Sequence, residues 1–290
     1  MLKGVQLTAK PKPDPNIPRL VAIVSGGRKA HLGSKILLSI FLCLPSGLRA
    51  TSIVVMRSDA GFVIAADSAL ADNDGNVVPI PGCKVFTTKN TIAWGYGGLM
   101  GGDGFDPTSV LRGAIDTSEL DILKARIPST IIPLLVKQAR QIRVAAPTKF
   151  QFFLEGNDIF EVFVATQQRA LMQGYRVTMD SGKNVSVVLT GTLDCQAGSP
   201  TCSAGRIMEI GIAAEIKKYA TTHKGEACRS LSYSDCAEFL VGLEVAAYPN
   251  LVRPPVDVVE ISAGGIVWKK RKPACDTVKS RTIQGHRTIH

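Results

Sequence analysis

The chain of 290 residues lacks the cysteine and histidine spacing that a zinc site requires. It contains no Cys-x-x-Cys motif, and none of His223, His286 and His290 is spaced to complete a ligand set. Structural zinc sites need four such ligands at characteristic spacings. We therefore expect no metal ion, and we expect no cofactor either.

The apolar run that ends before Pro45 has only about ten residues, whereas a helix needs about 20 to cross a bilayer. Basic residues precede this run, Pro45 and Gly47 break it, and the small residue Ala50 follows. This order is typical of a secretory leader. We expect residues 1–50 to be removed after Ala50, by a signal peptidase or autocatalytically, leaving no stable membrane anchor. The alternative is an uncleaved amphipathic extension or a buried helix.

Little of the basic charge lies in the part of the chain expected to fold. The formal net charge is +10, but residues 1–50 hold eight basic residues against one acid, and residues 269–290 hold seven against one. Residues 51–268 therefore carry a net charge of −3. Binding to nucleic acid requires clustered basic charge on a folded surface. We expect no nucleic-acid partner, and we interpret residues 269–290 as a solvated basic tail.

Six of the seven cysteines follow residue 50, and four of them form two close pairs, Cys195 with Cys202 and Cys228 with Cys236. Such spacing suits disulfides that staple turns in an oxidising compartment. Elimination alone leaves Cys83 with Cys275. Together with the leader, the cysteines predict a periplasmic or secreted protein.

Residues 51–268 are long enough for one sizeable core. Periodicity predicts strands at Ser52–Met56, Phe62–Ala66, Val85–Thr88, Thr91–Trp94, Phe150–Leu154, Ile159–Ala165, Ala170–Thr178, Val185–Thr190, Val256–Ser262 and Gly265–Trp268. It predicts helices at Pro128–Val144, Ile207–Ala220 and Ser234–Ala247. This order indicates an α+β fold, a four-layer αββα sandwich in which helices cover the outer faces of two antiparallel sheets.

Four motifs follow one another at the start of this domain. They are Thr51-Ser-Ile-Val-Val, Gly61-Phe-Val-Ile-Ala-Ala-Asp67-Ser68, Lys84-Val-Phe and Trp94-Gly-Tyr-Gly97-Gly98. Their order and spacing resemble the opening of proteasome β-type subunits, members of the N-terminal nucleophile hydrolases. The likeness recurs in residues 235–240 and 255–261, so that it covers most of residues 51–268.

The resemblance implies a role for each of four residues, in a threonine-type endopeptidase or amide hydrolase made as a zymogen. Thr51 would be the nucleophile, and its freed α-amine, with a pKa of about 7.7 to 8.0, would accept the hydroxyl proton. Lys84 would favour the ionised hydroxyl, and Asp67 would hold the lysine. The backbone N–H of Gly97 would stabilise the oxyanion. Alone, each residue also has a structural interpretation as a strand, turn or loop residue.

The sequence departs from the family pattern at three places. Lys84 lies one residue later than usual after Asp67, and Cys83 beside it could hold or displace the lysine in a disulfide. The serine expected before the third helix has only Ser203 as a candidate. Residues 248–255 replace the usual Asp followed by Ser-Gly-Gly. The polar shell around the nucleophile is therefore expected to be incomplete.

Three functions remain open from the sequence. The leading one is an exported hydrolase of peptide bonds, and the second is an amidase of the same class that acts on a small acylated amide. The third is a noncatalytic relative that keeps only the sandwich. Proteasome-like chains commonly assemble into rings, so the resemblance also implies a homo-oligomer.

Overall fold

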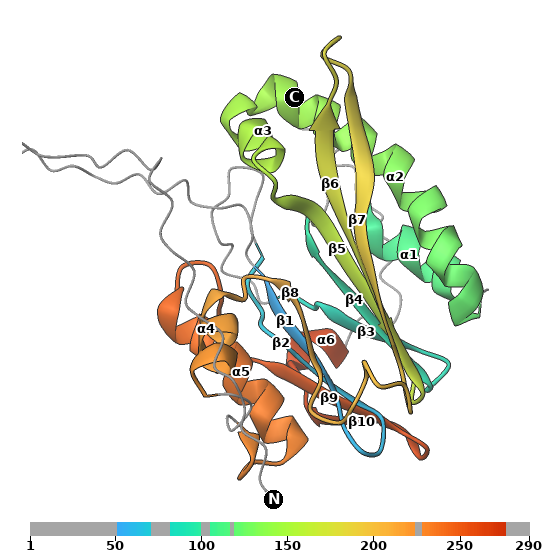
Figure 1. Cartoon of the computed structure of the whole chain (residues 1–290), viewed down its shortest axis with the longest axis vertical. Helices are drawn as coiled ribbons and strands as arrows, with labels where there is room; N and C mark the ends of the chain where they lie inside the picture. The colour runs from blue at the N-terminus through green and yellow to red at the C-terminus, as the bar shows by residue number, and fades with distance from the viewer. Residues whose placement is uncertain (1–50, 71–81, 100–104, 117–118, 224–227, 277–290) are drawn as a thin grey trace, which may run out of the picture. The chain divides into compact units, whose positions relative to one another are not determined.

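The computed structural model describes residues 51–70, 82–99, 105–116, 119–223 and 228–276, and Figure 1 shows their arrangement. Ten strands form two five-stranded sheets in this part of the chain. The first sheet has the order β10 (Gly265–Lys270), β9 (Asp257–Ser262), β2 (Phe62–Ala66), β1 (Ser52–Arg57), β8 (Ile207–Gly211). The second has the order β3 (Val85–Thr88), β4 (Ile92–Gly98), β5 (Asp158–Ala165), β6 (Arg169–Met179), β7 (Val185–Gln196). All strand pairs are antiparallel.

Helices cover the outer face of each sheet (Figure 1). The second sheet carries α1 (Pro107–Ile115), α2 (Leu120–Ala145) and α3 (Pro147–Leu154), and the first carries α4 (Ala214–Thr222) and α5 (Tyr233–Ala247). A short helix, α6 (Pro273–Asp276), follows β10. The described chain is thus the predicted α+β sandwich of four layers. None of its helices combines the length and apolar composition that a bilayer crossing requires.

Three apolar clusters hold the four layers together, one between the sheets and one under each group of helices. Strand β1 contributes to two of them, because Ile53 and Val55 face the second sheet whereas Val54 and Met56 face α5. A strand covered on both faces needs an unbroken apolar run, and residues 53–56 supply one. Burial on both sides fixes β1, and with it the position of Thr51.

Two predicted elements are wrong. Residues 150–154 belong to helix α3, in which Pro147 occupies the first turn and Phe150 and Phe153 are buried at helical spacing. A five-residue apolar run does not by itself distinguish a buried strand from a buried helix. The helix predicted from Ile207 is strand β8 followed by α4, with Gly211 at a φ of +81° closing the strand.

Most other elements agree with the sequence, and β2 and β3 have the predicted bounds. Helix α2 begins at Leu120 rather than at Pro128, and β7 extends to Gln196. Strand β10 continues to Lys270, and beyond it Lys272 is only 1 % exposed. Folded structure therefore reaches into the residues interpreted as a solvated tail.

The six cysteines after residue 50 form three disulfides, Cys83–Cys275, Cys195–Cys202 and Cys228–Cys236. All three predicted pairings are confirmed. The first joins residues 192 positions apart in the sequence, whereas the other two close short loops.

Candidate active site

Thr51 lies directly before β1, near the point where β8 of the first sheet contacts β4 of the second. Its carbonyl oxygen accepts a hydrogen bond of 2.7 Å from the N–H of Ile212, the residue after β8. From the second sheet, Gly97 of β4 comes so close that a Cβ added to it would lie 3.0 Å from Thr51 Cγ2. The residue predicted as nucleophile and the residue predicted as oxyanion donor are therefore neighbours.

Asp67, directly after β2, accepts hydrogen bonds through both carboxylate oxygens. Oδ1 receives the N–H of Ser52 at 2.7 Å and the Nζ of Lys84 at 2.6 Å. Oδ2 receives the N–H of Ala69 at 2.8 Å and that of Arg253 at 3.3 Å. Four donors converge on one buried side chain, so this position calls for a group that only accepts hydrogen bonds.

Lys84 lies just before β3, and neither it nor Asp67 has any exposed side chain. Since Ser52 and Lys84 share Asp67 Oδ1, the ammonium lies within a few ångströms of the peptide that joins Thr51 to Ser52. Burial lowers the pKa of Lys84 from 10.5 to about 8, against the opposing effect of Asp67. The site therefore contains a lysine whose pKa lies well below its ordinary value.

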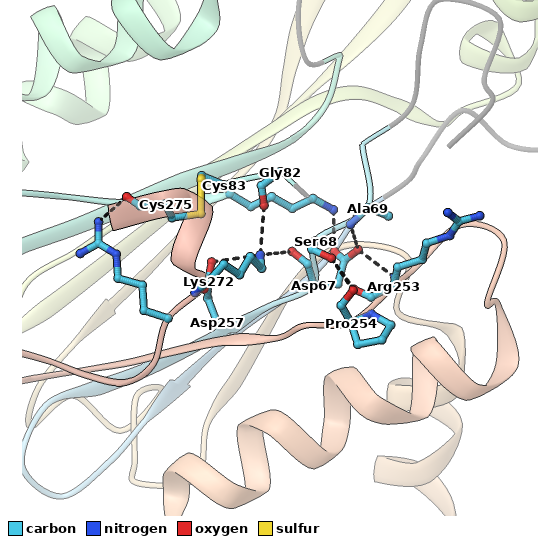
Figure 2. A network of polar contacts seen from close by, with 12 residues as sticks. Asp67, Ser68, Ala69, Gly82, Cys83, Arg253, Pro254, Asp257, Lys272 and Cys275 are labelled. Atoms are coloured by element: carbon cyan, nitrogen blue, oxygen red, sulfur yellow. Dashed lines mark hydrogen bonds and ion pairs between the residues drawn. A yellow bond between two sulfur atoms is a disulfide. The ribbon is translucent and has the colours of Figure 1, made fainter. Parts of the chain in front are cut away.

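A second buried ion pair, Lys272 with Asp257, lies beside Asp67 (Figure 2). Lys272 Nζ lies 3.0 Å from Asp257 Oδ2 and donates to the carbonyl oxygens of Asp67, at 2.8 Å, and of Gly82, at 3.1 Å. Burial lowers the pKa of Lys272, and Asp257 opposes that effect. Two lysines and two aspartates thus form one buried network.

Gly211 closes the site from β8. It holds a φ of +81°, and a Cβ on it would lie 2.1 Å from the carbonyl oxygen of Thr51. Its N–H donates to Oε2 of Glu161 at 2.8 Å, and Glu161 in β5 pairs with Gly97 in β4. This contact connects the two sheets beside Thr51.

The departures from the family pattern have clear outcomes. Lys84 reaches Asp67 despite its later position, and Cys83 beside it is bonded to Cys275, so the disulfide accompanies the pair without displacing it. Ser203 does not lie at the site. It precedes the end of β8 that pairs with Met56, about 17 Å along the strand from Thr51.

Residues 211–213, which contain no hydroxyl group, occupy the position before α4 instead. The segment 248–255 does contribute a contact, because the Arg253 N–H reaches Asp67. Ser68 fastens this segment by donating its hydroxyl to the carbonyl oxygens of Arg253 and Pro254 (Figure 2).

Sequence reasoning missed Lys272, Asp257 and Gly211. Lys272 stands in a run of four basic residues that is typical of an exposed tail. The pairing of Cys275 with Cys83, inferred from the cysteine count, was the one signal that this tail returns to the site. Within the described ranges, no group of three or more His, Cys, Asp or Glu residues is arranged to hold a metal ion.

No family model and no curated protein matches this chain. Solved structures that it resembles include eukaryotic HslV from Trypanosoma brucei, with 15 % identity over 72 % of this chain and 97 % of that one, at a TM-score of 0.39. A mutant of Anbu from Hyphomicrobium sp. has 14 % identity over 77 % of this chain and 86 % of that one, at a TM-score of 0.37. Anbu (ancestral beta-subunit) from Yersinia bercovieri has 13 % identity over 75 % of this chain and 86 % of that one, at a TM-score of 0.41.

Proposed function

We propose that this chain is the precursor of an exported hydrolase that cleaves amide bonds of peptides with Thr51 as its N-terminal nucleophile. The observation that carries the proposal is the double use of Asp67 Oδ1. One carboxylate oxygen fixes both the backbone after Thr51 and the ammonium of Lys84. A nucleophile needs such an arrangement, because its backbone and the cation that tunes it must keep one geometry.

The reaction divides into two steps. In the first, Thr51 Oγ bonds to the substrate carbonyl carbon while the α-amine takes the hydroxyl proton, directly or through a water molecule. The oxyanion accepts a hydrogen bond from the Gly97 N–H. The C–N bond then breaks, and the departing nitrogen takes the proton from the α-amine. In the second step, water hydrolyses the ester and restores the hydroxyl group. Lys84 lowers the cost of negative charge on Oγ throughout.

Removal of residues 1–50, which lie outside the described residues, is required for this chemistry. Before the cut, the Thr51 nitrogen belongs to an amide and cannot accept a proton; afterwards it is an amine with a pKa near neutral. The precursor is therefore inactive, as expected of a zymogen. The three disulfides support folding in an oxidising compartment, which for an exported chain is the periplasm or the extracellular space.

Peptides are the proposed substrates, and the mature chain is proposed to form a homo-oligomer. An exported enzyme has no supply of ATP to unfold its substrates, so these are short or already unfolded. The acidic balance of residues 51–268 gives no support to a nucleic-acid substrate.

The test begins with protein recovered from an exporting host. Intact mass and N-terminal sequencing are expected to show a chain that starts at Thr51. A β-lactone or epoxyketone is expected to label this residue, and the protein is expected to cleave fluorogenic peptides. Thr51→Ala is expected to abolish labelling and cleavage, whereas Thr51→Ser retains measurable labelling because it keeps a hydroxyl group.

Three outcomes would each point elsewhere. Cleavage of small acylated amides without cleavage of peptides would indicate the amidase. An unlabelled chain that nonetheless starts at Thr51 would indicate a noncatalytic relative, and full activity in Thr51→Ala would exclude Thr51 as the nucleophile.

The same variant shows how the leader is removed. If Thr51→Ala is still cut after Ala50, a host peptidase removes the leader; if it is not, the cut is autocatalytic.

A further inference from the structure

Lys272 lies just beyond the last strand, yet its side chain reaches the interior of the candidate site (Figure 2). Its Nζ lies within 3.1 Å of three oxygens: the carbonyl oxygens of Asp67 and Gly82 and Oδ2 of Asp257. These oxygens come from three separate segments of the chain. A single ammonium therefore joins the end of β2, the segment before β3 and the start of β9.

Two of these segments carry the pair predicted to tune the nucleophile. Asp67 is the acid of that pair, and Gly82 stands two residues before its lysine, Lys84. The same two segments also meet through a hydrogen bond of 2.8 Å from the Gly82 N–H to the Ser68 carbonyl oxygen. Lys272 therefore holds the backbone on both sides of the Asp67–Lys84 contact, at Asp67 itself and at Gly82 near Lys84.

Lys272 is itself held by two anchors. Its N–H donates to Asp257 Oδ1 at 2.7 Å. The N–H of Cys275 donates to the Lys272 carbonyl oxygen at 2.9 Å, and Cys275 is bonded to Cys83, the residue directly before Lys84. The disulfide thus connects the segment that carries Lys272 to the backbone of the lysine that it supports.

We propose that Lys272 is a positioning residue that fixes the Asp67–Lys84 pair, and that the Cys83–Cys275 disulfide keeps Lys272 in place. The inference rests on the proposed function, since it assigns Lys84 to the nucleophile. Charge as well as contact is involved. Burial is the main cause of the lowered pKa of Lys84, and the nearby charge of Lys272 adds to it. A purely structural ion pair would stabilise the fold without setting the titration of Lys84.

The first experiment compares three variants of mature protein by the rate at which an epoxyketone labels Thr51 between pH 6 and pH 10. Lys272→Met is expected to be labelled about tenfold more slowly at neutral pH, because the Asp67–Lys84 pair is no longer held in place. It is also expected to lose activity at a higher pH than the wild type, because the pKa of Lys84 rises when the charge of Lys272 is removed. Lys272→Arg keeps the charge and is expected to recover part of the rate and the original pH limit. Lys270→Met is the matched control, because Lys270 lies two residues before Lys272 and makes its ion pair with Glu238 at the surface. Its profile should not change.

The second experiment addresses the disulfide and does not depend on the stability of Lys272→Met. The double variant Cys83→Ser/Cys275→Ser is expected to show the same slower labelling and the same shift of the pH limit. Cys195→Ser/Cys202→Ser also removes one disulfide, and it is expected to be labelled at the wild-type rate. Equal rates for both double variants, or a Lys272→Met profile that is merely scaled down at every pH, would overturn the proposal.

A direct titration separates failure of this inference from failure of the proposed function. In Thr51→Ala protein with ¹³C-labelled lysine side chains, NMR follows Lys84 without any reaction. The Lys84 resonance is expected to titrate near pH 8, and at a higher pH when Lys272→Met is added. If the wild-type chain is never labelled, the proposed hydrolase function is rejected. A shift of the Lys84 titration in Lys272→Met would still support the role of Lys272. An unshifted Lys84 would reject that role even in an active enzyme.

Discussion

Lys84 and Asp67 form an ion pair of 2.6 Å between Nζ and Oδ1 in which neither side chain is exposed to solvent. Burying two charges costs several kcal/mol per ion, and their attraction repays that cost only in a good geometry. Such a pair is weak evidence for stability, but buried groups with shifted pKa values cluster at functional sites. The contacts of this pair with the backbone at Thr51 favour the functional explanation.

Replacement of Asp67 by asparagine is expected to destabilise the protein and to abolish activity. The amide NH₂ of asparagine would face the N–H groups of Ala69 and Arg253, or else the Lys84 ammonium, where an acceptor is needed. Loss of one partner from a buried pair typically costs about 3 to 5 kcal/mol. Urea denaturation should show this loss in the free energy of unfolding.

The control for this variant is Asp121→Asn, which removes a carboxylate from a pair with Arg169 that is 82 % exposed on the Asp121 side. Exposed pairs contribute about 0 to 1 kcal/mol, so this change should be nearly neutral. Equal losses of stability in the two variants would contradict the conclusion that the buried Asp67–Lys84 pair requires a carboxylate at Asp67.

The pH dependence of hydrolysis should reflect two groups that titrate close together. The α-amine of Thr51 must be uncharged, which requires a pH above about 7.7 to 8.0. Lys84 must be charged, and because burial lowers its pKa to about 8, its charge is lost as the pH rises through that value. The rate should therefore rise from acid pH, pass through a narrow maximum near pH 8 and fall again.

Measurement of kcat/KM from pH 5.5 to pH 10 checks this profile. In Lys84→Arg the guanidinium stays charged throughout the range, so the residual activity should show no fall on the alkaline side. A wild-type rate that stays level up to pH 10 would exclude Lys84 as the group responsible.

A methyl group at Gly97 is expected to disable the site. The added Cβ would lie 2.7 Å from Ile210 Cγ2 and 3.0 Å from Thr51 Cγ2, so Thr51 or the strand must move. Misplacing an oxyanion donor should cost about 100-fold or more in kcat. Gly113→Ala in helix α1 is the control, because an added Cβ there meets no heavy atom within 4 Å. It should keep full activity, and its stability should rise slightly, by about 0.5 to 1 kcal/mol.

The fold could be predicted from the sequence because its strands are buried in a regular way. Residues 53–56 are apolar throughout and face two cores, and the run at residues 62–66 behaves in the same way. Prediction failed where the pattern was short or mixed. Phe150–Leu154 satisfies both strand and helix preferences, and only its packing under α2 and against β6 decides between them.

The candidate site could be predicted only where its residues follow local motifs. Thr51, Asp67, Lys84 and Gly97 lie within 47 residues and keep a recognisable order. Lys272 is 205 positions from the Asp67 carbonyl that it binds, and no periodicity in one sequence connects such distant residues. The contact of Lys272 with Asp67 depends on the direction in which the chain leaves β10 and on the disulfide of Cys275 with Cys83.

A comparison of Gly211 with Gly198 separates the effect of backbone strain from the effect of contact with Thr51. Gly211 and Gly198 share a φ of +81°, which costs a residue with a Cβ about 1 to 2 kcal/mol. At Gly198 an added Cβ meets no heavy atom within 4 Å, whereas at Gly211 it would lie 2.1 Å from the Thr51 carbonyl oxygen. Gly198→Ala should therefore lose only that small amount of stability and keep the wild-type rate of Thr51 labelling.

Gly211→Ala should lose more stability than Gly198→Ala and should not be labelled, because the start of β1 must shift and the hydrogen bond from Ile212 N–H to Thr51 must lengthen. Urea denaturation and epoxyketone labelling of both variants measure the two effects. If the variants lost equal stability and were labelled equally fast, Gly211 would have no part in positioning Thr51.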